Sequence, residues 1–535
     1  MTKAQFGFNA DNTRDMMGVN HEGAPCYVLG LEDQVLQVLT TNTLGNTFYA
    51  SQQEIAQTTL DVLYRAVREC PEFLAKALVY ARNEGLLKTV PVVGLVVLST
   101  ARDKGLLEAV FDRVILIPDD LRSFVEWCKS GKIRGRKGFG GCVVPLVRRW
   151  LVRMSEYHAV KYGSSASKGF TLRDIIRLSH PKTSDPASHE RLGWLNRGWD
   201  AIGPAPSPTN PKLWALEALK RATSEDETVR LITEFGLPYE VVVPAVRSAS
   251  PRVWEALMMA APYMNMVRSL NTYARHGVFE NPVNVQYVVS RLTDPKAVEK
   301  SRLLPLRFFS AFQAYTATVG YNREIAEALS RAMDLMFVNM PEFPQGTRVA
   351  VAPDVSGSMD SPVSDKSQTR IIDIASIYAA SILKKSGQDT LLLPFDTKLH
   401  SVPLTGDDSL MAIATKIASY GGGGTSVGLP VQYLLDRKIE VDVCIGITDS
   451  EDWASGRGFD CRDSFIGLWR KYRQTVNRNA QAFLLTVAPY GHAVAPKDEP
   501  NVHFIYGWSD AVVGYIPKIV SAGLGQVDTI KRISL

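Results

Sequence analysis

The spacing of apolar residues changes within residues 340–346, and this change constrains the fold more than any other feature of the chain. Before it, apolar residues recur at every third or fourth position, as in amphipathic helices. After it, short β-branched runs such as RVAVAP and VDVCIGIT alternate with helical segments. Because 535 residues exceed what one hydrophobic core usually supports, the change predicts two domains, residues 1–343 and 344–535.

Residues 1–343 are predicted to form an all-α module of short helices. Successive short helices favour stacked pairs that bury their apolar faces against neighbouring pairs, as in HEAT-like repeats. The proline-rich segment AIGPAPSPTNPK, residues 201–212, is expected to be an irregular surface connection within the module. The clearest helical spacings fall in residues 52–69, 71–84, 121–128, 143–154 and 324–337.

Residues 344–535 alternate between strand and helix patterns, which predicts a doubly wound α/β domain with a parallel sheet and helices on both faces. In this architecture ligands bind at the carboxyl ends of the strands, so the loops that follow the strands are the candidate binding loops. Strands are expected at residues 348–353, 390–395, 441–448 and 482–489, and helices at 371–385, 409–419, 427–436 and 463–473.

Oxygen-bearing side chains occupy three of these loops. Asp354, Ser356 and Ser358 follow the first strand, Thr425 ends a run of four glycines, and Asp449 closes a later buried strand. Mg²⁺ prefers octahedral oxygen ligation and keeps several waters, so these five side chains predict a divalent metal site, most simply for Mg²⁺. The D-x-S-x-S pattern alone fits a serine or Asx turn equally well.

Two enzymatic interpretations of the same residues fail on chemistry. A phosphatase with an aspartyl nucleophile would need a second carboxylate where Ser356 stands. A phosphate-binding P-loop would need lysine after the glycines, where Thr425 stands. Since no general base adjoins these residues in the sequence, we predict no enzymatic activity, and a metal-dependent hydrolase is the least favoured function.

Positive charge is concentrated in one part of the chain. The whole chain has a net charge of only +5, and residues 346–535 hold 19 basic and 20 acidic side chains. Residues 129–182, in contrast, hold thirteen Lys or Arg against Glu156 and Asp174. Such an imbalance, with glycines and aromatic residues interspersed, is typical of a surface that binds the phosphates of a nucleic acid.

Three segments supply the candidate cations for such a surface. The densest run, KIRGRKGFGG at residues 132–141, also fits a merely solvated basic loop. Residues 171–182 predict a helix that ends before Pro181, with two arginines and a histidine on one face, although the histidine also fits a helix cap. Residues 264–276 predict a further helix, which fits an ordinary amphipathic helix equally well. The candidates are Lys132, Arg134, Arg136, Lys137, Arg173, Arg177, His180, Lys182, Arg268 and Arg275.

The chain has no apolar stretch of the roughly 20 residues that a membrane-spanning helix needs. Its first residues lack the apolar core of a signal peptide, so a cytoplasmic location without membrane association is expected. Six cysteines are scattered without a C-x-x-C pair, which indicates reduced thiols.

Several motifs resemble known families. DVSGSM, GGGGTS and ITDSED resemble the metal-ion-dependent adhesion site of von Willebrand A domains. Together with LRDIIRLSHPK and MNMVRSLNTYARHGVF in the helical part, the domain order resembles the Ro autoantigen family and its bacterial members, in which a TROVE module of helical repeats precedes a von Willebrand A-like domain. This resemblance spans nearly the whole chain.

The resemblance implies a specific biology. The helical module would close into a ring that binds small noncoding Y-type RNA on its outside and single-stranded ends of misfolded RNA in its central hole, in RNA quality control or decay. An exoribonuclease such as polynucleotide phosphorylase would be a partner, and no DNA specificity is expected. The ten basic candidates would contact RNA. Asp354, Ser356, Ser358 and Thr425 would bind the metal, Asp449 would bind it through water, and an acidic group of a partner would complete its coordination.

A different class of function fits the same sequence. The domain at 344–535 could be a metal-dependent protein-docking module, with the helices as a second docking surface and no RNA bound. Closure of a ring would require the C-terminal domain to meet both ends of the helical module, and residues 526–535 are a candidate for one such contact.

Overall fold

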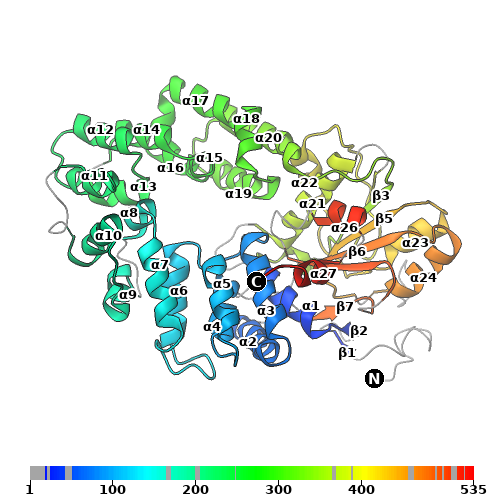
Figure 1. Ribbon diagram of the computed structural model, residues 1–535. Coiled ribbons are helices and arrows are strands. Elements are labelled where there is room, and N and C mark those ends of the chain that lie inside the picture. Colours follow the sequence, from blue (N-terminus) through cyan, green and yellow to red (C-terminus); the bar gives the residue numbers. More distant parts are fainter. Residues whose placement is uncertain are drawn as a thin grey trace. The chain divides into compact units, whose positions relative to one another are not determined.

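The protein divides into two compact units (Figure 1). One comprises Pro91–Ala297 and Ala311–Leu329, and the other comprises Met1–Val90, Val298–Ser310 and Ser330–Ser534. The second unit therefore combines both ends of the helical segment with the α/β domain. The computed structural model describes residues 18–20, 24–41, 51–163, 170–198, 205–246, 249–363, 369–386, 390–452, 454–455, 463–487, 491–496, 499–507, 515–522 and 525–535.

The unit centred on residues 91–297 is all-helical, as the spacing of its apolar residues predicts. Helices pack mainly against helices close in sequence: α7 lies against α9 and α10, α11 lies against α8 and α12, and α12 lies against α14. Such local packing is the pattern of a helical-repeat fold. Its helices include α5 (Gly105–Val114), α6 (Pro118–Lys129), α7 (Val143–Arg153), α8 (Glu156–Gly163), α9 (Leu172–Ser179), α10 (Pro186–Arg197), α11 (Pro211–Leu219), α12 (Glu225–Phe235), α13 (Tyr239–Ala245), α14 (Pro251–Ala260) and α17 (Pro282–Leu292).

Proline at the first helical position sets the start of many of these helices, because it lacks the N–H group that would be unsatisfied there. Pro118 begins α6, and the Asp120 carboxylate accepts hydrogen bonds from the preceding backbone N–H groups. Pro211 begins α11 at the end of the predicted irregular connection, of which residues 201–204 lie outside the described residues. Helices α4 (Thr89–Leu98), α18 (Pro295–Ser301), α19 (Pro305–Thr316) and α20 (Arg323–Leu335) span the boundaries between the units.

One predicted helix is wrong. Residues 264–276 form two short helices, α15 (Tyr263–Arg268) and α16 (Leu270–Arg275), because the chain leaves helical geometry at Ser269, whose φ is −104° and ψ is 4°. Arg268 and Arg275 therefore do not share the face of one continuous helix. Both side chains are exposed.

The α/β domain contains a five-stranded parallel sheet in the order β4-β3-β5-β6-β8. Helices α21 and α22 lie on one side of this sheet and α23 and α24 on the other (Figure 1), as expected for a doubly wound domain. The last strand was not predicted. The elements are β3 (Val349–Pro353), α21 (Ile371–Ser386), β4 (Thr390–Leu392), α22 (Leu410–Ala418), α23 (Leu429–Asp436), β5 (Val443–Thr448), α24 (Phe465–Thr475), β6 (Gln481–Thr486), β8 (Val502–Tyr506) and α26 (Tyr515–Ala522).

Strands within residues 18–28 pair with the α/β domain, and no strand was predicted there. Strands β1 (Gly18–Val19) and β2 (Pro25–Val28) form an antiparallel sheet with β7 (His492–Ala493). Helices α1 (Leu31–Thr41), α2 (Gln52–Glu69) and α3 (Pro71–Asn83) follow. The last helix, α27 (Gln526–Lys531), contacts α1, α3 and β8, which confirms a contact between the end of the chain and the first helices.

The described cysteines, Cys26, Cys70, Cys128, Cys142 and Cys444, are all free thiols, as predicted, and Cys461 lies outside the described residues. Burial raises the pKa of Cys128 and of Cys444 to about 12, so both thiols stay protonated. No helix among the described residues is long and apolar enough to cross a membrane.

Candidate metal centre and nucleic-acid interface

The first loop of the candidate metal centre is fixed by the sheet. Asp354 follows β3 and is fully buried, and its backbone N–H donates to the Ile447 carbonyl of β5 at 2.9 Å. Its side-chain oxygens accept from the Ser356 N–H at 2.9 Å and from the Thr448 hydroxyl at 2.7 Å. The carboxylate is therefore held in one orientation by the end of the neighbouring strand.

The remaining four predicted ligands lie at the same edge of the sheet. The hydroxyls of Ser356 and Ser358 are 3.3 Å apart, and the Ser358 hydroxyl hydrogen-bonds the Asp449 carboxylate. The N–H of Gly357 donates to the Gly423 carbonyl at 3.0 Å, which joins the first loop to the glycine run that precedes Thr425. Thr425 and Asp449 are both buried. The structure thus brings Asp354, Ser356, Ser358 and Asp449 together and joins the glycine run before Thr425 to the first loop.

Two glycines of this edge differ in how strictly the structure requires them. A Cβ at Gly357 would be in ordinary contact with its surroundings, at 3.5 Å from the nearest atom. Gly423 instead has a φ of +85°, and a Cβ there would lie 3.1 Å from the Asp396 carboxylate. Glycine at position 423 is therefore required by the backbone and by Asp396.

The electrostatics of this edge fit a divalent cation. Burial raises the pKa of Asp354 to about 6. Burial and the charge of Asp354 raise the pKa of Asp449 to about 8. Two buried, mutually repelling carboxylates beside three hydroxyls form the donor set that Mg²⁺ binds with water in its remaining positions. Since three donors are hydroxyls, this set differs from a cluster of three or more His, Cys, Asp or Glu side chains, which the described residues do not contain.

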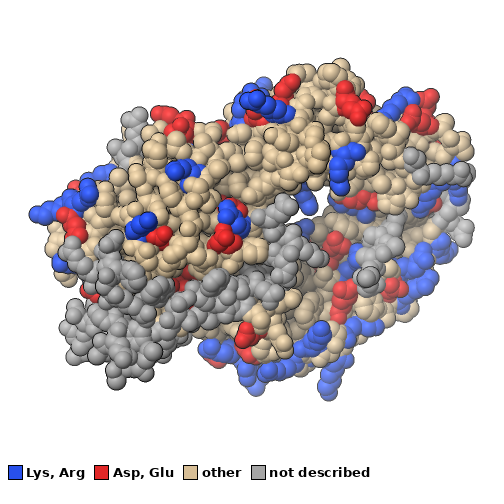
Figure 2. Space-filling view, turned by 180° about the vertical axis from the view of Figure 1, so that it is seen from behind, with Lys and Arg blue, Asp and Glu red and all other residues tan. Residues whose placement is uncertain are grey.

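The basic loop between α6 and α7 is folded on one of its own arginines. The Arg136 guanidinium donates to the carbonyls of Gly138 at 2.9 Å and Gly140 at 2.8 Å. It therefore shapes the loop, whereas the side chains of Lys132, Arg134 and Lys137 are exposed. On the face drawn in Figure 2, lysine and arginine gather along the lower right edge, the side of α6 to α9.

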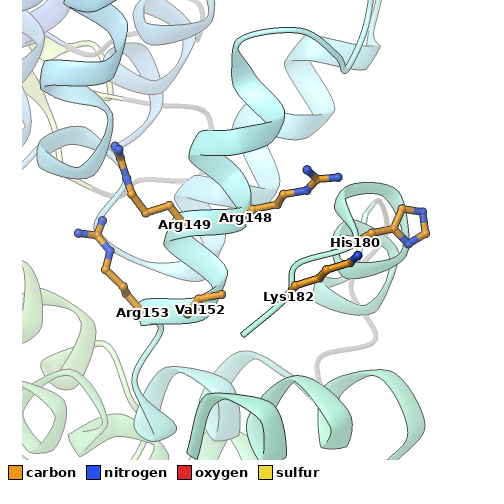
Figure 3. Close-up of a pocket in the computed structure, with 6 residues that line it drawn as sticks. All are labelled: Arg148, Arg149, Val152, Arg153, His180 and Lys182. Atoms are coloured by element: carbon orange, nitrogen blue, oxygen red, sulfur yellow. The ribbon is translucent and has the colours of Figure 1, made fainter. Parts of the chain in front are cut away.

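A basic pocket of about 540 Å³ lies between α7 and the segment that follows α9 (Figure 3). Arg148 extends from α7 toward the segment that bears His180 and Lys182 (Figure 3), and its Nε donates to the Ser179 carbonyl. His180 ends α9 in a left-handed conformation with φ of 49°, which turns the chain back toward α7. The pocket is lined by Arg148, Arg149, Val152, Arg153, His180 and Lys182.

The cations of the basic pocket differ in their partners. Arg149 pairs with Glu108 and Asp112 of α5, each at 3.0 Å, and Arg153 also pairs with Asp112. In the part of the chain that the structure describes, no acidic side chain pairs with Arg148 or Lys182. These two side chains therefore present positive charge to a ligand, and their N–H groups suit the oxygens of a phosphate.

The two arginines of α9 do not line the basic pocket. The Arg173 Nε donates to the Leu195 carbonyl at 3.3 Å, and the Arg177 Nε donates to the Asn196 side chain at 3.0 Å. Both therefore turn toward the end of α10. The predicted common face of Arg173, Arg177 and His180 is wrong, because the left-handed turn at His180 ends the helical geometry.

Comparisons with known proteins address the family directly. A model of the Ro60 von Willebrand A domain matches residues 348–520, and a model of the TROVE domain matches residues 242–345. Together they match just over half of the chain. The protein belongs to the Ro family.

Relatives in the Ro family align over most of this chain. The RNA-binding protein RO60 of Deinococcus radiodurans is 27% identical over 459 residues, which cover 81% of this chain and 83% of that protein. The RNA-binding protein RO60 of Caenorhabditis elegans is 25% identical over 467 residues, which cover 76% and 70%. Both relatives are named as RNA-binding proteins and not as enzymes, which agrees with the prediction of no enzymatic activity.

A solved structure supports the fold of this Ro-family chain. The crystal structure of the Deinococcus radiodurans Ro (RSR) protein superposes with a TM-score of 0.64 at 22% sequence identity, covering 92% of this chain and all of that one. The predicted fold class, helical repeats followed by a von Willebrand A-like domain, is thereby confirmed.

Sequence reasoning missed part of the basic pocket. Arg148 is one of the thirteen basic residues between 129 and 182 but was not among the ten candidate contacts. The helical spacing offered a signal. Arg149 and Arg153 lie four residues apart on the side of α7 that faces α5, and Arg148 points elsewhere (Figure 3).

Proposed function

We propose that this protein binds RNA and that the basic pocket receives phosphates of the RNA backbone. The strongest support is that Arg148 and Lys182 line the same pocket of about 540 Å³. Neither has an acidic partner among the described residues. The printed name of both relatives, RNA-binding protein, supports the same function. The exposed cations Lys132, Arg134 and Lys137 extend the positive surface.

The test is the affinity for a small structured RNA, with and without a single-stranded tail, across a salt series. Arg148→Ala with Lys182→Ala is expected to weaken binding by about 10- to 100-fold and to reduce the slope of log K against log salt by about two, because two phosphate contacts are lost. A matched control, Arg230→Ala with Arg252→Ala, removes the same charge from side chains already paired with Glu234 and Asp226. Equal affinity in all three proteins would disprove phosphate binding at the pocket.

A second variant tests the loop between α6 and α7. Lys132, Arg134 and Lys137 are replaced by alanine, while Arg136 is kept because it holds the loop carbonyls. We expect about a tenfold loss of affinity that is larger at low salt, since these exposed cations act mainly through long-range attraction. An effect independent of salt would argue against an electrostatic contribution.

The biology that we propose follows from membership of the Ro family. The bound RNA would be a small Y-type RNA on the outer surface, with single-stranded ends of misfolded RNA in the hole of a ring, in RNA quality control in the cytoplasm. An exoribonuclease such as polynucleotide phosphorylase would be the partner. Purification of the protein from its own cells, followed by sequencing of the associated RNA and identification of associated proteins, tests both. Recovery of no discrete small RNA would contradict the proposal that the protein binds a Y-type RNA.

We further propose that Asp354, Ser356, Ser358, Thr425 and Asp449 hold a divalent ion, most simply Mg²⁺. The ion would leave a position for an acidic group of a partner, and its role would be docking rather than catalysis. The buried carboxylate pair at the sheet edge favours this second function, metal-dependent protein docking. Docking without RNA binding is the alternative to the proposed RNA function, and it predicts a protein partner whose binding is abolished by a chelator.

Metal affinity is expected to depend on pH. Because the pKa of Asp449 is raised to about 8, the metal-free site holds a proton below that pH that the cation must displace. Affinity should therefore rise by about tenfold per pH unit from pH 6 to 8 and level off above. Without metal the sign for stability is opposite: the folded protein binds this proton and the unfolded chain releases it above pH 4, so stability falls as pH rises to 8. Isothermal titration with Mg²⁺ at several pH values measures the first effect.

A further inference from the structure

Asn20 links the start of the chain to the candidate metal centre. It follows β1 and its side chain is almost fully buried. The amide oxygen accepts from the Ala24 N–H at 2.8 Å, which joins the end of β1 to the residue before β2. The amide nitrogen donates to the Asp452 carbonyl at 2.9 Å, across 432 residues of sequence. One side chain therefore performs two separable tasks, one within the strand pair and one on the loop after Asp449.

The loop that Asn20 contacts is joined to the other ligand loop. The Asp452 carboxylate accepts from the Val427 N–H at 3.3 Å and from the Ser455 hydroxyl at 2.8 Å. The Ala454 N–H donates to the Thr425 carbonyl at 2.9 Å. Residues 449–452, 454–455 and 425–428 thus form one hydrogen-bonded network, with Asp449 and Thr425 within it. Asn20 contacts this network from outside the α/β domain.

The strand pair that bears Asn20 has its own attachment to the domain. Strand β2 pairs with β7, with Tyr27 opposite Ala493 and Val28 opposite His492. A support that is itself fixed at a second point can restrain the position of the loop that it contacts. The apparent affinity of a binding loop is proportional to the fraction of time that the loop spends in the conformation that binds the ligand.

We propose that Asn20 is a positioning residue for the metal centre, acting through its hydrogen bond to the Asp452 carbonyl. The inference rests on the proposed metal site and adds that the first strands of the chain, outside the α/β sequence pattern, set the affinity of that site. Asn20 itself does not contact the metal. It acts by holding the segment from Asp449 to Ser455 against the Thr425 loop.

Two substitutions separate the two tasks of Asn20. Asn20→Asp keeps an oxygen that accepts from Ala24 but replaces the donor to Asp452 with an acceptor, so the bond to Ala24 is kept and the loop contact is lost. Asn20→Ala removes both. The matched control is Gln37→Ala: Gln37 is also buried, and its side chain accepts from the Gly491 N–H at 3.0 Å, a contact with the α/β domain away from the metal loops.

The probe is Mn²⁺, followed by the electron paramagnetic resonance signal of the free ion, in the full-length protein. We expect both Asn20 variants to weaken Mn²⁺ binding by about five- to tenfold and to speed amide exchange at Val427 and Ala454. Gln37→Ala should lower the midpoint of thermal unfolding but leave Mn²⁺ affinity within about twofold of wild type.

The possible results distinguish the positioning role of Asn20 from the existence of the metal centre. Wild-type affinity and unchanged amide exchange in the Asn20 variants would overturn the positioning role and leave the metal centre standing. Equal weakening in Gln37→Ala would also overturn it, since the effect would then be general destabilisation. Absence of saturable Mn²⁺ binding in the wild type would overturn the metal centre itself and the inference with it.

Discussion

Asp354→Asn is expected to abolish saturable Mg²⁺ binding, with a loss of affinity greater than about 100-fold. The substitution keeps the shape of the side chain but removes one of two buried charges that the cation would neutralise. The same change is expected to stabilise the metal-free protein, because burial and the charge of Asp354 together raise the pKa of Asp449 to about 8, and the substitution removes the second of these costs. Isothermal titration measures the first effect, and thermal unfolding in a chelator measures the second.

Asp442→Asn is the matched control for this prediction. Asp442 precedes β5, at the opposite edge of the sheet from Asp354, and pairs with Arg348 at 2.9 Å. Its replacement should lower stability and leave Mg²⁺ affinity unchanged. If Asp354→Asn bound Mg²⁺ as tightly as wild type, the buried carboxylates would be a structural feature of the fold and the metal proposal would be wrong.

Truncation after Gly525, which removes α27, is expected to destabilise the unit that contains the α/β domain by about 4 kcal/mol. Gln526 is buried between β8 and α3. Its side chain accepts from the Tyr506 N–H of β8 at 3.2 Å and donates to the Tyr80 hydroxyl of α3 at 3.0 Å. Ile530 is fully buried. Its loss leaves a cavity, and the loss of Gln526 removes one hydrogen bond from β8 and one from α3.

The midpoint of urea unfolding, followed by tryptophan fluorescence, measures this effect. Lys531→Ala serves as the control, because its ion pair with Glu32 at 2.8 Å is half-exposed and is expected to contribute less than about 1 kcal/mol. A truncated protein as stable as Lys531→Ala would show that α27 rests on the surface without closing the core between α3 and β8.

Local sequence determined many of the elements of this fold. Helix α2 occupies the predicted residues 52–69, because Ser51 and Glu54 form a capping box that defines its start. The parallel strands β3, β5 and β6 were also recognised, because strands buried on both faces are nearly continuous apolar runs. Strand β8 was missed, since its residues become a strand only by pairing with β6.

Local sequence was less informative where two helices meet. The spacing in residues 264–276 fits one helix, and the break at Ser269 leaves no signal in the sequence. Arg136 and Lys137 look equivalent as neighbours in a basic run, yet one shapes its loop and the other is exposed. Charge predicts that a segment is basic, whereas the partners of each side chain come from the surrounding structure.

The sequence by itself determined the domain order and the side chains of the candidate metal centre. Asp354, Thr425 and Asp449 each follow a strand or a glycine run, and the carboxyl ends of parallel strands necessarily meet at one edge of the sheet. The tertiary structure alone decided the basic pocket, in which Arg148 comes from α7 and Lys182 from the segment after α9, and the contact of Asn20 with Asp452. The physical reason is range: periodicity and capping act within a few residues, whereas these contacts depend on how distant elements pack.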